Sequence, residues 1–384
     1  MLLAIDAHAI GCRLTGNEVY VRNLLAGLAA LGADCRILAY VTASNLNGAL
    51  PPGVERRQIA RNPVVRLGYE LSRKLRRDRP DLLHVQYTAP LNCPVPVVVT
   101  VHDVSFLERP EFFPLLRVQQ LRFTVERTVR SAAMVITGSR FSCEAIQRAY
   151  ALAPEKVTVV PNAAAPIFRP LDCEHAARQV AGKLGIRRPF ILTVGDLQPR
   201  KNHIGLIEAF AAAKRADPGL PHSLVLAGKP TWFAPRIYEA AERSGLSAEI
   251  HFTGFISDED LLLLYNACEF FVFPSFYEGF GLPLLEAMAC GRAVACSNAT
   301  ACPEVAGPAA LFFDPNSIDQ MASAMLELAG NEKLRSRLEE LGQERAAAFS
   351  WRLSAEMTLE AYRKASDVAG FVAGKILASS TVSQ

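Results

Sequence analysis

The sequence contains no hydrophobic run long enough to cross a membrane. Its best apolar run, residues 95–101, is far shorter than the ~18 residues of a membrane-spanning helix. The first residues, Met1-Leu2-Leu3-Ala4-Ile5-Asp6, lack the basic segment of a secretory signal and reach an acid at once. We therefore expect neither a membrane span nor a signal peptide, and we interpret these residues as the first buried strand of a cytoplasmic protein.

Paired cysteines of the kind that bind zinc are also absent. The chain has nine cysteines, an odd number, and none of them forms a Cys-x-x-Cys pair. Cys290, Cys296 and Cys302 are too widely spaced for a zinc knuckle and have no histidine beside them. We expect free thiols that pack as small buried hydrophobic residues in a reducing compartment, and no metal site.

Two nucleotide-binding signatures are missing after the first strand. Residues 11–18 have glycines spaced as in a P-loop, but Asn17-Glu18 stands where that loop needs Lys followed by Ser or Thr. No Gly-x-Gly-x-x-Gly follows the strand either, which counts against a dinucleotide-dependent oxidoreductase. The basic residues lack interleaved aromatic side chains, so we expect no nucleic-acid partner.

The composition is that of a globular protein with room for two or three domains. Of the 384 residues, 50% are hydrophobic and 21% are charged. Residues 1–172 carry 21 Lys and Arg against 14 Asp and Glu, whereas the remaining residues carry 20 against 24. This asymmetry favours different partners for the two halves, or an uneven surface charge without function.

Short apolar runs alternate with amphipathic stretches twice along the chain, which is typical of α/β domains with parallel sheets. We expect strands at residues 2–5, 35–41, 82–85, 97–101, 134–137 and 157–160, then at 190–194, 224–227, 250–253, 270–273, 293–296 and 310–313. Expected helices of the first half are 18–31, 64–79, 113–130 and 141–150. We predict two doubly wound, Rossmann-like domains facing each other across a cleft, at residues 1–170 and 189–350, with a linker at 171–188 and a C-terminal helix with a frayed tail at 351–384.

The most informative segment follows the expected strand at 270–273. A glycine-rich turn over residues 274–281 leads into a helix that starts near Pro283. Peptide N–H groups of such a turn, together with the helix N-terminus, form a seat for a phosphate. Glu278 and Glu286 flank this seat, and carboxylates beside a phosphate suit the hydroxyl groups of a ribose and a second polyol. The combination indicates a sugar nucleotide, although an ordinary strand–turn–helix with a surface acid has the same spacing.

Two further loops carry polar groups at strand ends. The loop of residues 195–202 contains the adjacent cations Arg200 and Lys201, which suit a diphosphate or belong to a solvated basic loop. His102 and Asp103 follow the strand at 97–101, where an imidazole facing a substrate would lie. A single histidine in that place is as often structural as functional.

One further segment has the spacing of a metal site, and another has the pattern of a helix that binds a membrane surface. Asp258-Glu259-Asp260 has the Asp-x-Asp spacing of some metal-dependent transferases, but after Ser257 it is typical of a capped, acidic helix start, which we prefer. Residues 64–79 combine an apolar stripe with many arginines. This pattern predicts a packed helix with a solvated basic face, which we prefer, or peripheral contact of the first domain with the anionic inner face of the cell membrane.

In this order, the motifs resemble those of the retaining glycosyltransferases of family 4, which have the two-domain GT-B fold. The resemblance covers nearly the whole chain and is carried by the Glu-x7-Glu motif of Glu278 and Glu286 and by the loop Pro199-Arg200-Lys201-Asn202. Shorter matches are Val101-His102-Asp103, Val160-Pro161-Asn162, Thr253-Gly254-Phe255 and residues 297–307. The resemblance implies that the first domain binds the acceptor, that the second binds a nucleotide-diphosphate sugar, and that the C-terminal helix crosses back to the first.

The resemblance also implies a role for each matching residue. Arg200 and Lys201 would hold the diphosphate, and Glu278 and His102 would contact the donor sugar, as the catalytic groups. The donor would further contact Gly16, Gly195, Asn202, Gly228, Gly254, Phe255, Ile256, Gly279, Phe280, Gly281, Leu282 and Glu286, with Glu286 on the ribose hydroxyls. The acceptor side would include Asp103, Ser139 and Arg140, and no metal or other cofactor would be needed.

The expected reaction is retaining transfer of a hexose to a hydroxyl group of a glycan or lipid-linked acceptor, in the synthesis of a cell-surface polysaccharide or glycolipid. Asp196 departs from the family pattern, because many relatives carry Arg directly after the glycine of this loop. The Pro-Arg-Lys-Asn loop resembles a subgroup of mannosyltransferases, which favours GDP-mannose over UDP-glucose or dTDP-rhamnose as the donor. The alternative is a sugar-nucleotide-binding or epimerase-type protein of the same fold that transfers no glycosyl group.

Overall fold

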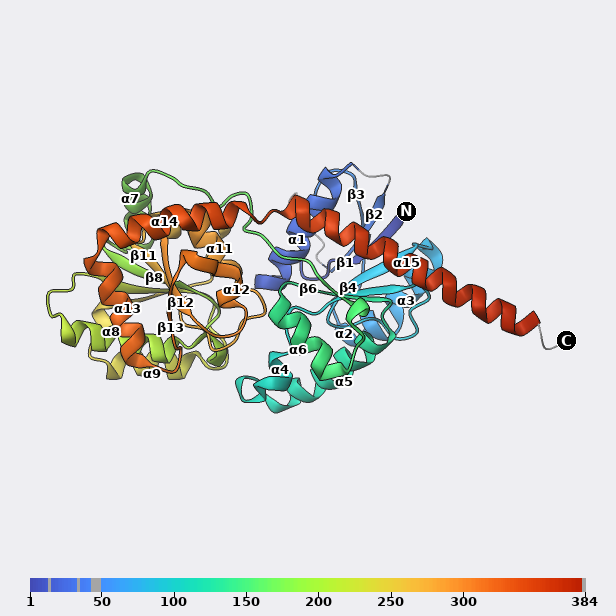
Figure 1. Cartoon of the computed structure of the whole chain (residues 1–384), viewed down its shortest axis with the longest axis horizontal. Coiled ribbons are helices and arrows are strands. Elements are labelled where there is room, and N and C mark those ends of the chain that lie inside the picture. Colours follow the sequence, from blue (N-terminus) through green and yellow to red (C-terminus); the bar gives the residue numbers. More distant parts are fainter. Residues whose placement is uncertain (13–14, 33–34, 43–49, 382–384) are drawn as a thin grey trace. The chain divides into compact units, whose positions relative to one another are not determined.

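The chain folds into two units, each built on one parallel sheet. The computed structural model describes residues 1–12, 15–32, 35–42 and 50–381. Unit 1 comprises residues 1–162 and 350–384, and unit 2 comprises residues 163–349. Helices cover both faces of each sheet, as the alternating pattern predicts (Figure 1). The prediction of two doubly wound domains is therefore confirmed.

Unit 1 contains a seven-stranded sheet in the order β3-β2-β1-β4-β5-β6-β7. Its strands are β1 (Leu2–Asp6), β2 (Arg36–Val41), β3 (Val54–Gln58), β4 (Leu82–Gln86), β5 (Val97–Thr100), β6 (Met134–Thr137) and β7 (Val157–Val159). Its helices are α1 (Thr15–Ala30), α2 (Pro63–Val65), α3 (Leu71–Asp78), α4 (Ser105–Glu108), α5 (Leu115–Ser131), α6 (Arg140–Tyr150) and α15 (Trp351–Thr381). Helix α15 packs on α1, so the predicted return of the chain to its first unit is confirmed.

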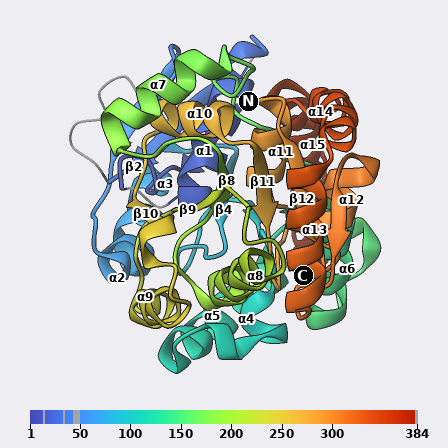
Figure 2. The ribbon, with the colours of Figure 1, turned by 90° about the vertical axis from the view of Figure 1, so that its left-hand side faces the viewer.

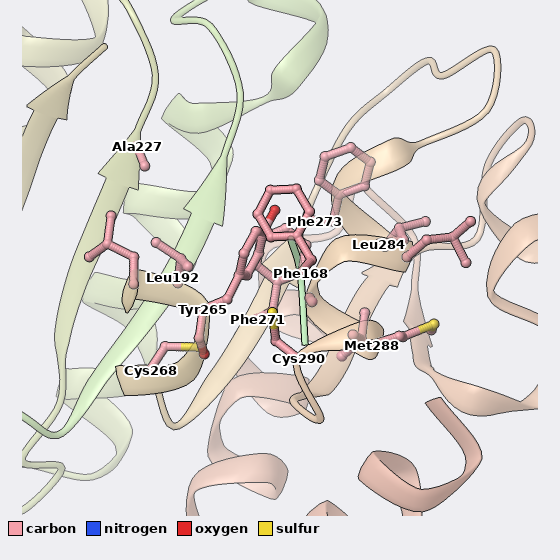
Figure 3. Close-up of a cluster of buried hydrophobic side chains, with 14 of the residues drawn as sticks. Phe168, Leu192, Ala227, Tyr265, Cys268, Phe271, Phe273, Leu284, Met288 and Cys290 are labelled. Atoms are coloured by element: carbon pink, nitrogen blue, oxygen red, sulfur yellow. The ribbon is translucent and has the colours of Figure 1, made fainter. Parts of the chain in front are cut away.

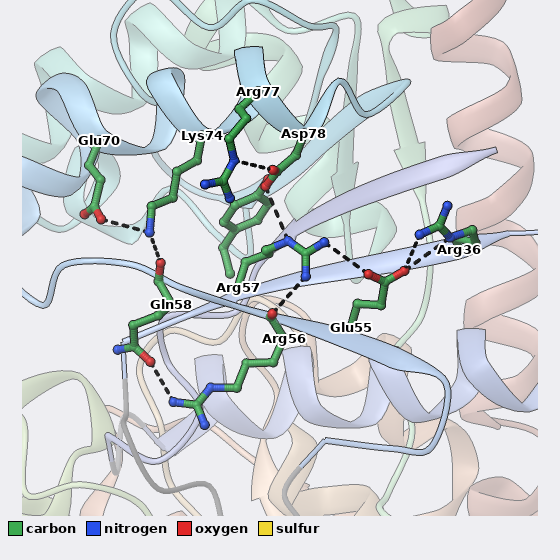
Figure 4. Close-up of polar contacts among 10 residues, drawn as sticks. Arg36, Glu55, Arg56, Arg57, Gln58, Glu70, Lys74, Arg77 and Asp78 are labelled. Carbon is green, nitrogen blue, oxygen red and sulfur yellow. Dashed lines mark hydrogen bonds and ion pairs between the residues drawn. The ribbon is translucent and has the colours of Figure 1, made fainter.

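Strand β3 is the one strand of the described sheets that the sequence did not predict. Its residues are mostly charged, and it lies at the edge of the sheet beside β2. Charged side chains protect such an edge from pairing with another chain. Glu55 pairs with Arg36 and Arg57, at 2.6 Å and 3.1 Å, and Arg57 also lies 3.5 Å from Asp78 of α3 (Figure 4).

The helix expected over residues 64–79 is interrupted by a π-helical turn, η1 (Arg66–Glu70), between α2 and α3. Leu71 and Leu75 of its apolar stripe are fully buried in the core, as a packed helix requires. Two of its cations are engaged within the unit, because Lys74 pairs with Glu70 at 3.1 Å and Arg77 pairs with Asp78 at 3.0 Å (Figure 4).

Unit 2 contains a six-stranded sheet in the order β10-β9-β8-β11-β12-β13. Its strands are β8 (Phe190–Val194), β9 (Ser223–Ala227), β10 (Ile250–Gly254), β11 (Phe270–Phe273), β12 (Ala293–Ser297) and β13 (Leu311–Phe313). Its helices are α7 (Cys173–Leu184), α8 (His203–Ala216), α9 (Ala234–Arg243), α10 (Asp258–Ala267), α11 (Leu282–Ala289), α12 (Cys302–Ala306), α13 (Ile318–Gly330) and α14 (Glu332–Ala347).

The unit 2 core consists of two apolar layers, one on each face of the sheet. Helices α7, α10 and α11 cover one face, and α8, α9 and α13 cover the other (Figure 2). Successive strand residues alternate between the layers, so Phe271 and Phe273 face α10 and α11 (Figure 3). Phe270 belongs to the opposite layer. Strands buried on both faces explain the unbroken apolar runs of the sequence.

The boundaries of the elements differ from the predictions mainly between the units. The predicted strands are all present, with ends shifted by one residue at most. The segment expected to be a linker, 171–188, contains helix α7, which packs on α10 within unit 2. Helix α15 extends to Thr381, so the tail that was expected to fray continues the helix, and residues 382–384 lie outside the described part.

Two predictions about the whole chain can be compared with this fold. All nine cysteines are free, as expected. Cys268, Cys290, Cys296 and Cys302 are buried as predicted, whereas the other five are only partly buried. In the described ranges, no helix is both long enough and apolar enough to cross a lipid bilayer.

Candidate active site

The candidate site lies at the carboxyl edge of the unit 2 sheet. The chain winds outward from β8 toward β9 and β10 on one side, and toward β11, β12 and β13 on the other. The loops that follow β8 and β11 therefore diverge at a switch point, which is where ligands bind in sheets of this kind. The loop after β8 carries Arg200 and Lys201, and the loop after β11 carries Glu278.

Glu278 connects the two loops through ion pairs with both cations. Nζ of Lys201 lies 2.7 Å from Oε1 of Glu278, and Nη1 of Arg200 lies 3.1 Å from Oε2. Arg200 also donates to the carbonyl of Tyr277 at 3.0 Å. Glu278 and Lys201 are buried, with 6% and 8% of their surface exposed. The two predicted cations and the first glutamate of the motif thus form one cluster.

The electrostatics of this cluster keep Glu278 ionised. Burial alone would raise the pKa of Glu278, but Arg200 and Lys201 outweigh burial and hold that pKa at about 2. Burial also lowers the pKa of Lys201, and the charge of Glu278 opposes that shift. Nζ of Lys201 lies 4.7 Å from the centre of the Phe273 ring, which adds a cation–π contact. An anion that entered this cluster would compete with Glu278 for two cations.

Glu286, the second glutamate of the motif, lies inside helix α11. Its carboxylate is buried and accepts a hydrogen bond of 2.9 Å from the hydroxyl of Tyr265 in α10. Gly281 precedes the helix with a φ of +98°, a conformation that favours glycine, and Pro283 occupies the first turn. The N–H groups of a first helical turn have no intrahelical acceptors, so this end of α11 suits an anion, as predicted. Gly279, Phe280 and Leu282 belong to the same turn.

Tyr265 belongs to the site, and sequence reasoning missed it. It ends the leucine-rich run of α10, where the helical pattern marks it as a core residue. Its ring is indeed buried against Phe168 and Phe271. Its hydroxyl, however, also orients the carboxylate of Glu286. The spacing between Tyr265 and Glu286 in the sequence has no recognisable pattern that would have predicted this contact.

Three strand ends approach one another closely beside the cluster. A Cβ added to Gly228 would lie 1.9 Å from the carbonyl oxygen of Gly195, so only glycine fits there. The N–H of Gly228 donates to the carbonyl of Gly254 at 3.1 Å. Asp196, the residue that departs from the family pattern, has its carboxylate 3.5 Å from Nζ of Lys229. Lys229, which sequence reasoning missed because it follows a different strand, partly offsets that charge.

The remaining predicted donor residues of unit 2 occupy nearby loops. Asn202 starts α8, and its Nδ2 donates to the carbonyl of Pro315 at 2.7 Å. This contact ties the loop after β8 to the segment after β13. Phe255 and Ile256 follow β10, and Phe255 is 46% exposed. Their roles toward a ligand stay predictions.

The predicted residues of unit 1 follow the carboxyl ends of its strands. His102 and Asp103 follow β5, Ser139 and Arg140 follow β6, and Gly16 lies near the start of α1, after β1. Because these strands are parallel, all five residues belong to one edge of the sheet. Their contacts with a substrate stay predictions.

His102 is fixed by its neighbours, and the residues around it have structural duties. Nε2 of His102 lies 2.8 Å from Oε1 of Gln86. Burial lowers the pKa of His102 to about 4, although Asp103 opposes this shift. Oδ1 of Asp103 accepts from the N–H of Ser105 at 2.9 Å, which fixes the start of α4. Ser139 caps α6 by accepting from the N–H of Ser142 at 3.1 Å, and Arg140 and Gly16 are exposed.

The acidic triplet of residues 258–260 forms a helix start, as predicted. Oγ of Ser257 accepts from the N–H of Asp260 at 3.2 Å and caps α10. The carboxylate of Asp260 lies 2.7 Å from Nζ of Lys183. Over the residues that the structure describes, no group of three or more His, Cys, Asp or Glu is arranged to hold a metal ion.

Two family models match the chain in succession. The model described as Glycosyltransferase Family 4 matches residues 14–166, and the one described as Glycosyl transferases group 1 matches residues 179–345. The first match falls almost entirely within unit 1, and the second falls within unit 2. Each unit is thus matched by a glycosyltransferase model of its own.

Individual proteins give the same result. The O-antigen chain mannosyltransferase B of Escherichia coli is 33% identical over 266 residues, which are 69% of this chain and 70% of that protein. The serotype-specific mannosyltransferase WbdA of Escherichia coli is 34% identical over 56% of this chain, which spans 26% of that protein. The crystal structure of HepE of Anabaena in complex with UDP-glucose has a TM-score of 0.76 at 19% identity, over 94% of this chain and 99% of that one. The chain therefore belongs to glycosyltransferase family 4 and is a retaining hexosyltransferase with the GT-B fold.

Proposed function

We propose that this chain transfers mannose from GDP-mannose to a hydroxyl group of a glycan or lipid-linked acceptor in the synthesis of a cell-surface polysaccharide. The observation that carries the proposal is the cluster of Arg200 with the buried Lys201 and Glu278, beside the first turn of α11. It combines two cations for a diphosphate with a carboxylate suited to sugar hydroxyls. The mannosyltransferases among the relatives and the Pro-Arg-Lys-Asn loop support mannose as the sugar.

In this proposal the donor lies along the carboxyl edge of unit 2. Arg200, Lys201 and the N–H groups of the first α11 turn bind the diphosphate. Glu286, held by the Tyr265 hydroxyl, accepts hydrogen bonds from the ribose. Glu278 and His102 contact the sugar. The base is bordered by Gly254, Phe255 and Ile256, and the donor site further includes Gly16, Gly195, Asn202, Gly228, Gly279, Phe280, Gly281 and Leu282.

The proposed reaction proceeds on one face of the sugar. The bond between the anomeric carbon and the diphosphate oxygen breaks while the acceptor oxygen bonds to the same face of that carbon. The proton of the acceptor hydroxyl passes to the departing diphosphate, and Arg200 and Lys201 stabilise the charge that develops there. NMR of the product should show an α-linkage from the α-linked donor, and a β-linkage would contradict this route.

The first experiment is a thermal-shift comparison of GDP, UDP, dTDP and ADP, each alone and as its nucleotide sugar. A ligand that binds only the folded state raises the unfolding midpoint, so the largest shift identifies the donor base. We expect GDP and GDP-mannose to give that shift, and Lys201→Met to reduce it. A larger shift with UDP or dTDP would replace GDP-mannose by UDP-glucose or dTDP-rhamnose. Binding without release of GDP in the presence of glycan acceptors would favour a sugar-nucleotide-binding protein instead.

We also propose that unit 1 touches an anionic membrane around η1, where a lipid-linked acceptor would be presented. The side chains of Val64, Val65 and Tyr69 are 78%, 49% and 64% exposed, and the exposed Arg73 lies 6.0 Å from the centre of the Tyr69 ring. Exposed apolar side chains beside a cation are typical of interfacial contacts. Because Leu71 and Leu75 of the apolar stripe pack into the core, contact around η1 would pass through these exposed side chains.

Flotation with vesicles containing phosphatidylglycerol tests this contact. The protein should float with anionic vesicles at low salt and remain behind with neutral ones. The double variant Val64→Ser, Tyr69→Ser should lose flotation, whereas Trp232→Ser, which changes an exposed aromatic of unit 2, should not. Equal flotation of both variants, or none for the original protein, would remove the proposal.

A further inference from the structure

The side chain of Gln86 connects two sides of the switch point in the unit 1 sheet. Gln86 ends β4, which lies beside β1, and only 8% of its surface is exposed. Its Nε2 donates to the carbonyl of Asn17 in α1 at 3.2 Å. Its Oε1 lies 2.8 Å from Nε2 of His102, which follows β5. One buried amide thus joins the helix after β1 to the proposed substrate-facing histidine.

These two contacts determine how the amide is oriented. A backbone carbonyl can only accept a hydrogen bond, so the atom of Gln86 that faces Asn17 must be the NH2 group. The oxygen of Gln86 then faces His102, and an oxygen can only accept. Turning the amide by half a rotation would place its oxygen against the carbonyl oxygen of Asn17, and no hydrogen bond can form between two acceptors. The nitrogen of His102 that faces Gln86 therefore carries a proton.

The surroundings of the ring keep the imidazole neutral with that proton in place. Burial lowers the pKa of His102 to about 4, so the second nitrogen is unprotonated near pH 7. Tyr20 packs edge-on against the ring, with centres 4.8 Å apart, and Tyr87 does the same at 5.6 Å. Two other titratable groups lie near the ring. Asp103 favours the protonated, cationic form of His102, and His84 is itself kept neutral by burial.

A second chain of contacts fixes Tyr20 and with it the plane of the His102 ring. The hydroxyl of Tyr20 lies 2.8 Å from Oγ1 of Thr100, which lies 2.7 Å from Nε2 of His84. Nδ1 of His84 lies 2.5 Å from the hydroxyl of Tyr362 in α15. The His102 ring is thus held by the Gln86 amide and by Tyr20, whose own contacts continue to helix α15.

We propose that Gln86 is a positioning residue that holds His102 as its Nε2–H tautomer, so that Nδ1 accepts a hydrogen bond from a substrate hydroxyl group. The inference deepens the proposed function, because it depends on His102 facing a substrate. It assigns His102 the role of a hydrogen-bond acceptor in the ground state. A substrate group that can only accept hydrogen bonds would place its lone pair against the lone pair of Nδ1, and such a substrate would bind poorly.

NMR of the full chain with ¹⁵N-labelled histidine tests the tautomer directly, with His102→Asn used to assign the signals. In the original protein Nε2 should have the shift of a protonated ring nitrogen and Nδ1 that of an unprotonated one. In Gln86→Met the two signals should move toward the average of a mixed tautomer population. A protonated Nδ1 in the original protein, or unchanged shifts in Gln86→Met, would overturn the inference.

Kinetics separate the positioning role from a purely structural one. Gln86→Met should lower kcat about 10- to 100-fold, the usual cost of losing an orienting partner, with little change in KM. Gln86→Glu places a carboxylate on Nε2 and should move the acid limb of the pH–rate profile to higher pH. The matched control is Gln58→Met, because Gln58 also ends a strand and donates to a backbone carbonyl, that of Thr42.

The outcomes also distinguish this inference from the proposed function. Nucleotide-induced thermal shifts should survive in Gln86→Met, because the donor cluster belongs to unit 2. A fixed tautomer in the original protein with full activity in Gln86→Met would remove His102 from the substrate site while leaving the glycosyltransferase assignment intact. Loss of the nucleotide shift in Gln86→Met would show a general loss of folding and overturn the positioning role.

Discussion

Glu278 occupies the two cations that the diphosphate of a donor would need. Its oxygens lie 2.7 Å from Lys201 and 3.1 Å from Arg200, and all three groups belong to loops at one switch point. In the absence of a donor, the carboxylate therefore neutralises the buried ammonium group of Lys201, whose burial without a counter-charge would cost several kcal/mol. When a diphosphate binds, it takes over this task, and Glu278 becomes available to sugar hydroxyls.

This exchange predicts opposite effects of one substitution on binding and on turnover. Glu278→Gln removes the competing charge, so GDP should bind more tightly while kcat falls because the sugar loses a charged partner. Without ligand, the variant should unfold at a lower temperature, because Lys201 is left buried and unpaired. Calorimetric titration with GDP and thermal unfolding measure both effects.

Glu208→Gln is the matched control, since it makes the same change on helix α8, outside the cluster. It should alter neither GDP affinity nor turnover. Weaker binding of GDP by Glu278→Gln than by the original protein would show that Glu278 supports the diphosphate site and does not compete with the nucleotide.

Lys201 carries the second prediction at this scale. Lys201→Met keeps the length of the side chain and its packing on Phe273 but removes the charge that stabilises the leaving group. We expect kcat to fall about 100- to 1000-fold, the scale measured for the loss of one electrostatic contact to a transition state, ~2.7–4 kcal/mol. Steady-state kinetics with GDP-mannose give this value, and a fall below tenfold would assign the stabilisation to Arg200 and α11.

At the scale of elements, the sequence was sufficient where burial dictates the pattern. Strands buried on both faces are apolar throughout, so β5, β8 and β11 were predictable within one residue. The turn before α11 was predictable because glycine and proline each have a local conformational reason to be there. Glu278, Arg200 and Lys201 were predicted in loops at the carboxyl ends of strands, which lie at one edge of a parallel sheet, but the ion pairs among them were not predicted.

The remaining elements depend on neighbours that are distant in the sequence. Strand β3 carries charges that are satisfied by Arg36 and Asp78, so no alternation of apolar residues marks it. Lys229 and Gln86 acquire their roles from residues on adjacent strands, and a single strand cannot show which side chain its neighbour supplies. Asp103, predicted on the acceptor side, accepts a hydrogen bond from the N–H of Ser105 at the start of α4, and its contact with a substrate stays a prediction.

The packing of α15 on α1 provides a prediction for an element. A Cβ added to Gly27 of α1 would lie 2.6 Å from the carbonyl oxygen of Trp351 and 3.1 Å from Cβ of Ala355. Gly27→Ala should therefore displace α15 and destabilise unit 1 by about 1–3 kcal/mol, as overpacking does. Hydrogen exchange should become faster in α15 than in the original protein.

Gly182→Ala in α7 is the control, because a Cβ there would meet nothing within 4 Å. An alanine inside that helix should stabilise unit 2 by about 0.5–1 kcal/mol, since alanine is the better helix former. Equal protection of α15 in Gly27→Ala and in the original protein would show that the two helices do not depend on this close approach.

At the scale of the whole molecule, buried histidines determine how stability depends on pH. Burial lowers the pKa of His84 and His203 to about 3 and that of His102 to about 4. In the unfolded chain these groups titrate at about 6.5. Between about pH 6.5 and 4 the unfolded state therefore binds protons that the folded state does not, and stability decreases as the pH falls.

Glu278 affects the stability in a lower pH range than the histidines do. Its pKa is about 2 in the folded protein, whereas a glutamate titrates at about 4.3 in an unfolded chain. Its contribution is complete above about pH 4.3 and is lost only as the pH falls toward 2. A decline of stability that begins near pH 6.5 must therefore come from the histidines, and one that begins near pH 4 would come from carboxylates.

Chemical denaturation measured from pH 7.5 to 4.5 should show the first decline, because each buried histidine contributes up to about 1.4 kcal/mol per pH unit. His84→Gln should flatten the curve, since glutamine can still bond to Thr100 and Tyr362 but takes up no proton on unfolding. His175→Gln, on the exposed side of α7, should leave the slope unchanged. A flat profile down to about pH 5 would mean that the folded protein protonates its histidines as readily as the unfolded chain. In that case the neutral His102 that Gln86 requires would not be the resting state.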